Sequence, residues 1–146
     1  MPRRVRKAPE LETYTPANVM TPIGPYNHIA KYGNFIMIGG PAGVDPATNE
    51  IAGPDVATQT IQILDAFESK LRSVDSDLDH VLHVSVFLAD MSDFAGMNRA
   101  YEAKMGDCRP ARTAIGVSGL PKPGALVTMN LTAVTRRSAE KEVVRY

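Results

Sequence analysis

Arg112 is the residue whose type and surroundings most suggest chemistry in this 146-residue sequence. Its planar guanidinium can hold a carboxylate through two parallel hydrogen bonds. Residues 112–118 alternate as a strand does, so Arg112 shares a face with Ala114 and Gly116, whose small side chains leave room for a ligand. From these residues alone, a structural ion pair is the other interpretation of Arg112.

The three histidines and the single cysteine invite a metal or nucleophile interpretation that their spacing does not support. His28, His80 and His83 follow no zinc-site pattern, and Cys108 is remote from them in the sequence. No recognisable base motif accompanies Cys108, so a small packed thiol is its more ordinary role. We therefore expect no metal site.

Composition narrows the possible partners. The chain is 44% hydrophobic and 22% charged, which is typical of a globular domain, and its formal net charge is zero. A nucleic-acid partner is not expected without a positive surplus. No apolar run approaches the roughly 20 residues that cross a bilayer. With no secretory signal at the N-terminus and one cysteine, we expect a cytoplasmic protein that does not bind membranes.

Three regions are expected along the chain. Residues 1–22 contain four prolines and no sustained period, and they predict an extended N-terminal arm. Residues 23–136 hold the periodic segments of one domain with one core. Residues 137–146 form a charged C-terminal tail.

The elements that must position Arg112 follow from hydrophobic periodicity. Apolar segments at 26–31 and 34–40 predict two strands joined by a turn at Gly33-Asn34. An apolar stripe with helical spacing predicts a helix from Asp55 to about residue 74, and a second runs from 92 to 105 and ends at Gly106.

Three further strands are predicted at 80–89, 112–118 and 125–134, which gives the order β-β-α-β-α-β-β. Two amphipathic helices can cover one face of such a mixed α+β sheet, and that face takes the aliphatic positions, Leu82 among them. We expect the other face to form a partly buried interface between subunits. It would carry His83, Ser85, Arg112, Ala114, Thr128 and Asn130.

A set of short motifs in this order resembles the RidA/YjgF reactive-intermediate deaminase family over residues 22–134. The motifs are Ile23-Gly24-Pro25-Tyr26, Gly39-Gly40 with Asp45-Pro46, residues 86–90, Asp93-Phe94 with Asn98 and Tyr101, Arg109-Pro110-Ala111-Arg112, and Leu120-Pro121-Lys122. The resemblance implies a chorismate-mutase-like fold and a homotrimer with sites in the clefts between subunits. Stacking of trimers into a hexamer is an alternative.

The resemblance also implies roles for particular residues. Arg112 would bind the substrate carboxylate, Tyr26 would line the cleft, and Asn98 would contact either the ligand or a loop. Three departures enlarge the cleft: Thr128 stands where a glutamate is usual, Gly39 where a serine is common, and Ala114 where a cysteine is common. Asn130 is expected to face the same way as Thr128, and either could place the attacking water.

The chain looks most like the 2-aminomuconate deaminases of this superfamily, which implies hydrolysis of an enamine or imine to 4-oxalocrotonate and ammonia without a cofactor. A general 2-imino acid deaminase is one alternative, and a non-catalytic trimer that binds small carboxylates is another. The ribonuclease activity of some relatives is disfavoured by the zero net charge. Arg109, Arg99 and His28 are candidates for a second cation that binds a distal carboxylate.

Overall fold

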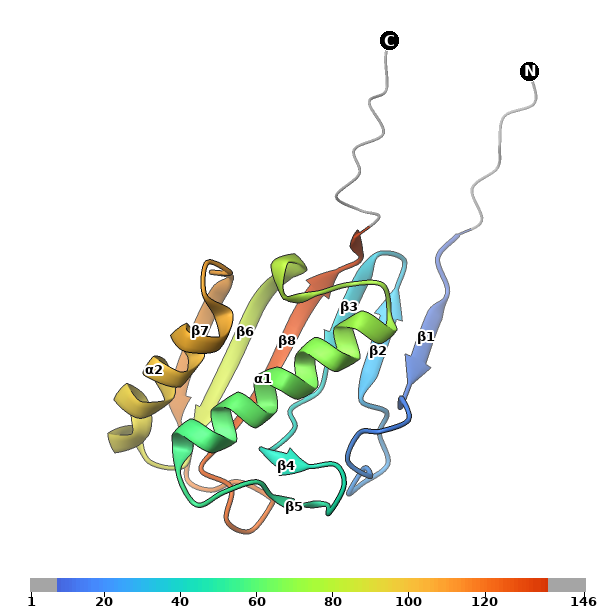
Figure 1. Ribbon diagram of the computed structural model, residues 1–146. Coiled ribbons are helices and arrows are strands. Elements are labelled where there is room, and N and C mark those ends of the chain that lie inside the picture. Colours follow the sequence, from blue (N-terminus) through green and yellow to red (C-terminus); the bar gives the residue numbers. More distant parts are fainter. Residues whose placement is uncertain (1–7, 137–146) are drawn as a thin grey trace, which may run out of the picture.

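The computed structural model describes residues 8–136, in which two helices cover one face of a six-stranded sheet (Figure 1). The strand order is β1-β2-β3-β8-β6-β7, and every neighbouring pair is antiparallel except β6 and β7. The strands are β1 Leu11–Tyr14, β2 Ile29–Tyr32, β3 Phe35–Ile38, β6 Val81–Leu88, β7 Ala111–Gly116 and β8 Val127–Val134. A separate two-stranded ribbon pairs β4 Val44–Asp45 with β5 Glu50–Ile51.

Helix α1, Val56–Ser73, begins where its sequence provides a cap. The Asp55 carboxylate accepts hydrogen bonds from the Thr58 backbone N–H and the Thr58 hydroxyl, both at 2.8 Å. This satisfies one of the N–H groups that the first helical turn leaves unpaired. The predicted apolar stripe is buried against the sheet, with Ile63, Leu64, Phe67 and Leu71 at most 1% exposed.

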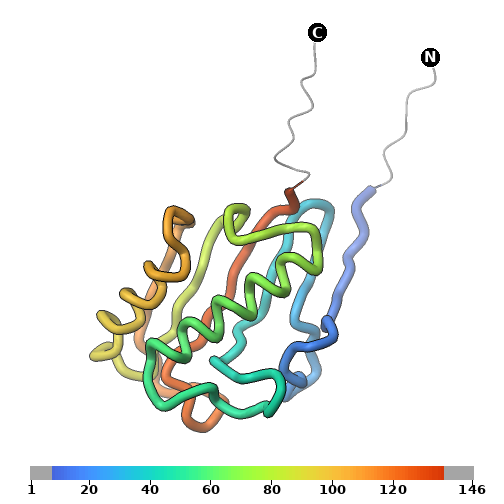
Figure 2. Tube along the Cα trace, viewed as in Figure 1, coloured from blue at the N-terminus to red at the C-terminus, as the bar shows by residue number. Residues whose placement is uncertain are grey.

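Helix α2, Phe94–Met105, follows a short 3-10 turn at Met91–Asp93 and lies beside α1 on the same face of the sheet (Figure 2). It ends at Gly106, which has a φ of 57° and donates its N–H to the Glu102 carbonyl at 2.9 Å. A second 3-10 turn, Leu78–His80, leads from α1 into β6. The predicted α+β fold with both helices on one face is confirmed.

The N-terminal arm contributes a strand that the sequence analysis did not assign. Strand β1 pairs antiparallel with β2, with Glu12 opposite Lys31. All four of its residues are exposed, because an edge strand without a covering helix needs no buried side chains. Residues 1–7 and the predicted tail at 137–146 lie outside the described residues.

The alternating faces of β8 agree with the prediction, whereas the start of β6 does not. Val127, Met129 and Leu131 are buried under the helices, and the side chains between them face the other way. In β6, however, Val81 is buried and Leu82 is 45% exposed, the reverse of the expected assignment. A register shift between Val81 and His83 inverts the pattern at this end of the strand.

The prediction that Arg112 and Ala114 lie on the open face of the sheet is wrong. The parallel register puts Arg112 opposite Val84 and Ala114 opposite Val86, and both valines are buried under the helices. Arg112 and Ala114 therefore face α2 rather than the open face. Ile115 suggested the opposite assignment, but β7 is an edge strand and Ile115 is 47% exposed.

Among residues 8–136, no helix lies over the open face of the sheet (Figure 1). Large apolar side chains are exposed on this face. Strand pairing and alternation place on this face Leu11, Tyr32, Phe35, Met37 and Ile115, each between 47% and 70% exposed. An apolar surface of this kind is typical of a protein–protein interface. Within residues 8–136, no helix is long and apolar enough to span a membrane.

Candidate functional site

The first half of the candidate site is a cavity of about 420 Å³ that we call the tyrosine pocket. It contains three of the predicted residues, Tyr26, Gly39 and Thr128. A tight turn holds Tyr26: its backbone N–H bonds the Gly24 carbonyl at 2.9 Å, and its hydroxyl accepts the Ile23 N–H at 3.2 Å. The remaining lining residues are Met20, Ile23, Asn27, His28, Gly40, Pro41, Ala42, Pro121 and Lys122.

Lys122 supplies a cation to the tyrosine pocket, and the sequence analysis did not select it as a site residue. Its ammonium donates a hydrogen bond to the Asn49 carbonyl at 3.0 Å. An ammonium has three donors, so this bond leaves two for a ligand. The sequence feature that could have identified Lys122 as a site residue is its place in the Leu120-Pro121-Lys122 motif.

His28 also lines the tyrosine pocket, but it is a poor candidate for the second cation. The residue is 5% exposed, and its Nε2 has no hydrogen-bond partner among residues 8–136. Burial lowers the pKa of His28 below 6.5, and the nearby Lys70 amine lowers it further. The imidazole is therefore mainly neutral near pH 7.

The second half of the candidate site is a cavity of about 290 Å³ between α2 and β7, which we call the arginine pocket. It contains the predicted residues Arg112 and Asn98. The Arg112 guanidinium carbon lies 4.7 Å from the Tyr101 ring centre and 5.9 Å from that of Phe94. The other lining residues are Glu102, Met105, Gly106, Cys108, Arg109 and Pro110.

The Arg112 guanidinium forms no hydrogen bond or ion pair within residues 8–136. This argues against the structural ion pair that was the alternative interpretation of the residue, at least within one chain. The aromatic rings hold the guanidinium while leaving its five N–H donors unused. An anion in the arginine pocket could therefore bind Arg112 without displacing a protein carboxylate.

Arg109 and Cys108 of the arginine pocket are already paired with carboxylates. Arg109 is exposed and lies 3.5 Å from the Glu102 carboxylate. The Cys108 thiol donates a hydrogen bond to Asp79 at 2.8 Å, and this carboxylate, together with burial, raises the thiol pKa to about 11. Cys108 is therefore a protonated thiol near neutral pH and not an activated nucleophile.

The structure does not bring all the predicted site residues together in one chain. The two pockets share no lining residue, so Arg112 and Asn98 are separated from Tyr26, Gly39 and Thr128. Asn130 lies on the open face opposite Ser85 and lines neither pocket. Ala114 packs against the core, and Arg99 lines neither pocket.

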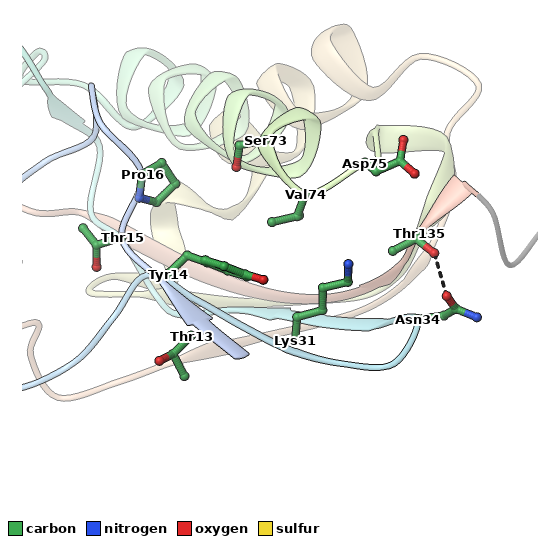
Figure 3. A pocket seen from close by; sticks show the side chains of 10 residues that line it. All are labelled: Thr13, Tyr14, Thr15, Pro16, Lys31, Asn34, Ser73, Val74, Asp75 and Thr135. Atoms are coloured by element: carbon green, nitrogen blue, oxygen red, sulfur yellow. Dashed lines mark hydrogen bonds between the residues drawn. The ribbon is translucent and has the colours of Figure 1, made fainter. Parts of the chain in front are cut away.

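A further cavity, of about 730 Å³, contains none of the predicted residues. It lies between the C-terminal end of α1 and strands β1 and β2, and Figure 3 shows the Lys31 and Tyr14 side chains extending into it. A hydrogen bond of 3.0 Å between Thr135 and Asn34 closes one end. No three His, Cys, Asp or Glu side chains of residues 8–136 lie close enough to hold a metal ion.

Comparisons with known proteins relate most of the chain to one family. Residues 16–135 match the family model described as Endoribonuclease L-PSP. A RutC family protein of Pyrococcus horikoshii is 44% identical over 105 residues, which cover 72% of this chain and 83% of the relative.

Solved structures agree with this relation. The YjgF gene product of E. coli has a TM-score of 0.79 and 32% identity, covering 86% of this chain and 99% of its own. RidA from an Antarctic Psychrobacter has a TM-score of 0.79 and 29% identity, covering 84% of this chain and 98% of its own.

Proposed function

Because this chain belongs to the Endoribonuclease L-PSP family, we propose that it is a hydrolytic deaminase of enamine and imine carboxylates, with 2-aminomuconate as its substrate. The products are 4-oxalocrotonate and ammonia. The observation that carries this proposal is the Arg112 guanidinium, which lines an open pocket and has no carboxylate partner among residues 8–136. A guanidinium free of protein carboxylates is suited to holding a substrate carboxylate.

The proposed site is shared between copies of the chain in a homotrimer. Support comes from the division of the candidate groups between two separate pockets, neither of which holds both the arginine and the tyrosine. Further support comes from the exposed apolar residues of the open sheet face, which a second copy would cover. In the trimer, the arginine pocket of one copy lies against the tyrosine pocket of the next.

The reaction needs no cofactor in this scheme. The dienamine takes a proton at carbon to become an iminium ion, and water adds to the iminium carbon. The resulting carbinolamine loses ammonia, which leaves the carbonyl product. Arg112 holds the carboxylate beside the reacting carbon, and the Tyr26 phenol contacts the substrate. The Thr128 hydroxyl orients the water but is no base near neutral pH, so the protons move through water and the substrate's own groups.

The shape and charge of the tyrosine pocket support a long dicarboxylate as the substrate. Gly39 contributes no side chain, and its environment leaves space, because a Cβ there would meet only the His28 carbonyl at 3.9 Å. Lys122 is the cation that we assign to the distal carboxylate, with Arg112 of the neighbouring copy on the other. A three-carbon imino acid carries no second carboxylate for Lys122.

A carboxylate-binding trimer without turnover is the second candidate, and Thr128 is the observation that favours it. A threonine in place of the usual glutamate removes the group best suited to activate water. The test is ammonia release from enzymatically generated 2-aminomuconate and from 2-iminobutyrate, each corrected for spontaneous hydrolysis. Faster turnover of 2-iminobutyrate would indicate a general imino acid deaminase. Binding of dicarboxylates without turnover would indicate the binding protein.

Variants of the arginine pocket sharpen this test. We expect Arg112→Ala to lower kcat/KM roughly 30- to 1,000-fold through loss of charge-assisted hydrogen bonds to the substrate. Arg112→Lys should recover little, because an ammonium cannot form the paired bonds of a guanidinium. Arg109→Ala is the matched control, since it removes an exposed arginine from the same pocket. Near-normal turnover in both folded Arg112 variants would contradict the assignment.

A further inference from the structure

Lys70 of α1 is an amine buried inside the fold. We propose that it is a covalent modification site, at which small neutral aldehydes condense with the Lys70 amine inside its cavity. This inference does not depend on the proposed deaminase function. It concerns a third cavity, which adjoins the tyrosine pocket and shares no residue with the arginine pocket.

The position of Lys70 is unusual for a lysine. The residue is 1% exposed and lies on the buried face of α1, beside Phe67 and Leu71, which are fully buried. Its amine forms no hydrogen bond or ion pair in the described part of the chain. Buried charges are normally paired, so burial of an amine without a partner shifts its equilibrium toward the neutral, nucleophilic form.

The Lys70 cavity has a volume of about 210 Å³ and mostly apolar walls. Its lining includes Met20, Pro41, Ala42 and Val44. The one carboxylate on its wall, Asp65, is held by Lys104 at 2.8 Å and forms no ion pair with Lys70. These mostly apolar walls suit a small neutral carbonyl compound.

The chemical state of Lys70 supports this reactivity. Burial lowers the pKa of its amine from 10.5 to about 8. At pH 7 about a tenth of such an amine is neutral, against about three in ten thousand for an ordinary lysine. The neutral amine adds to the aldehyde carbon to give a carbinolamine, which loses one water molecule to form an imine. No oxidant or reductant is consumed.

An adduct on Lys70 would lie next to the candidate catalytic site. Met20, Pro41 and Ala42 line both the Lys70 cavity and the tyrosine pocket. A group added to Lys70 therefore occupies space behind the wall that faces the Tyr26 side chain. This places a carbonyl-sensitive residue where it can alter the shape of the tyrosine pocket.

The test is reductive labelling of the full chain with propionaldehyde and sodium cyanoborohydride at pH 7. The cyanoborohydride reduces each imine to a stable secondary amine. Peptide mapping by mass spectrometry then gives the rate of labelling at each lysine. We expect Lys70 to be labelled at least about 10-fold faster than Lys31 and Lys122, which lie outside the Lys70 cavity and serve as internal controls. The preference should disappear when the chain is unfolded in urea.

The result that would overturn the proposal is labelling of Lys70 in the folded chain at a rate equal to or below that of Lys31. Lys70→Arg keeps the positive charge and removes the reactive amine. In this variant, the fast phase of labelling, meaning the part of total aldehyde incorporation that is at least about 10-fold faster than labelling of Lys31, should be absent. Persistence of the fast phase in the folded Lys70→Arg variant would equally overturn it.

Discussion

Replacing Lys70 by methionine should stabilise the folded chain, because the native amine is buried without a hydrogen-bond or ion-pair partner among residues 8–136. The amine pKa falls from 10.5 to about 8 on folding. Each pKa unit corresponds to about 1.4 kcal/mol, so holding the charged form in the interior costs about 3 kcal/mol near neutral pH. Methionine fills a similar volume without a charge, and Lys70→Met should recover most of that cost.

The stabilisation should depend on pH in a defined direction. Between pH 8 and 10.5 the unfolded chain binds more protons at Lys70 than the folded chain does. The penalty is therefore complete below pH 8 and disappears as the pH rises to 10.5. The difference between Lys70→Met and the native chain should shrink across this window.

Urea unfolding at equal protein concentration measures this difference at pH 7 and again near pH 10.5. Lys104→Met is the matched control on the other helix. The Lys104 ammonium contacts Asp65 at 2.8 Å and Glu68 at 3.3 Å, and these bonds raise its pKa. We expect Lys104→Met to be destabilising where Lys70→Met is stabilising. A Lys70→Met variant that is less stable than the native chain, or whose advantage does not change with pH, would refute this reasoning.

Two further predictions concern packing and thiol reactivity. Gly43→Ala should lower the free energy of unfolding by roughly 2–3 kcal/mol in urea denaturation, because the added Cβ would lie 2.7 Å from the Gln59 backbone. Gly119→Ala is the control: its Cβ would meet nothing within 4 Å, so the free energy of unfolding should change by less than about 0.5 kcal/mol. Cys108 should react slowly with iodoacetamide near pH 8, and Asp79→Asn should speed this reaction several-fold; equal rates would contradict the role of the Asp79 carboxylate.

The helices and the middle of the sheet could be predicted because their sequence patterns admit one solution. The stripe through Ile63 and Phe67 fits only a helix, and the alternation of β8 has one fully apolar face. Asp55 and Gly106 mark helix ends by their own chemistry. These features are local, so they do not depend on which strands are neighbours.

The face of β7 could not be predicted, because both of its faces are mixed. Arg112 and Ala114 alternate with Thr113 and Ile115, and neither pair is clearly apolar. Their orientation depends on the register with β6, which is a long-range contact. The exposed strand β1 gives no burial pattern at all. Lys70, in contrast, interrupts the apolar stripe of α1, and that signal was present in the sequence.

The shared site is tested most directly by mixing two damaged chains. Arg112→Ala removes the group of one pocket, and Tyr26→Ala removes a group of the other. The two variants are co-expressed in equal amounts, and light scattering checks that they form trimers. Each interface site then has a one-in-four chance of receiving an intact Arg112 from one copy and an intact Tyr26 from the next. About a quarter of the native 2-aminomuconate turnover should therefore return. Turnover no higher than the average of the two variants alone would contradict a site built from two copies of this chain.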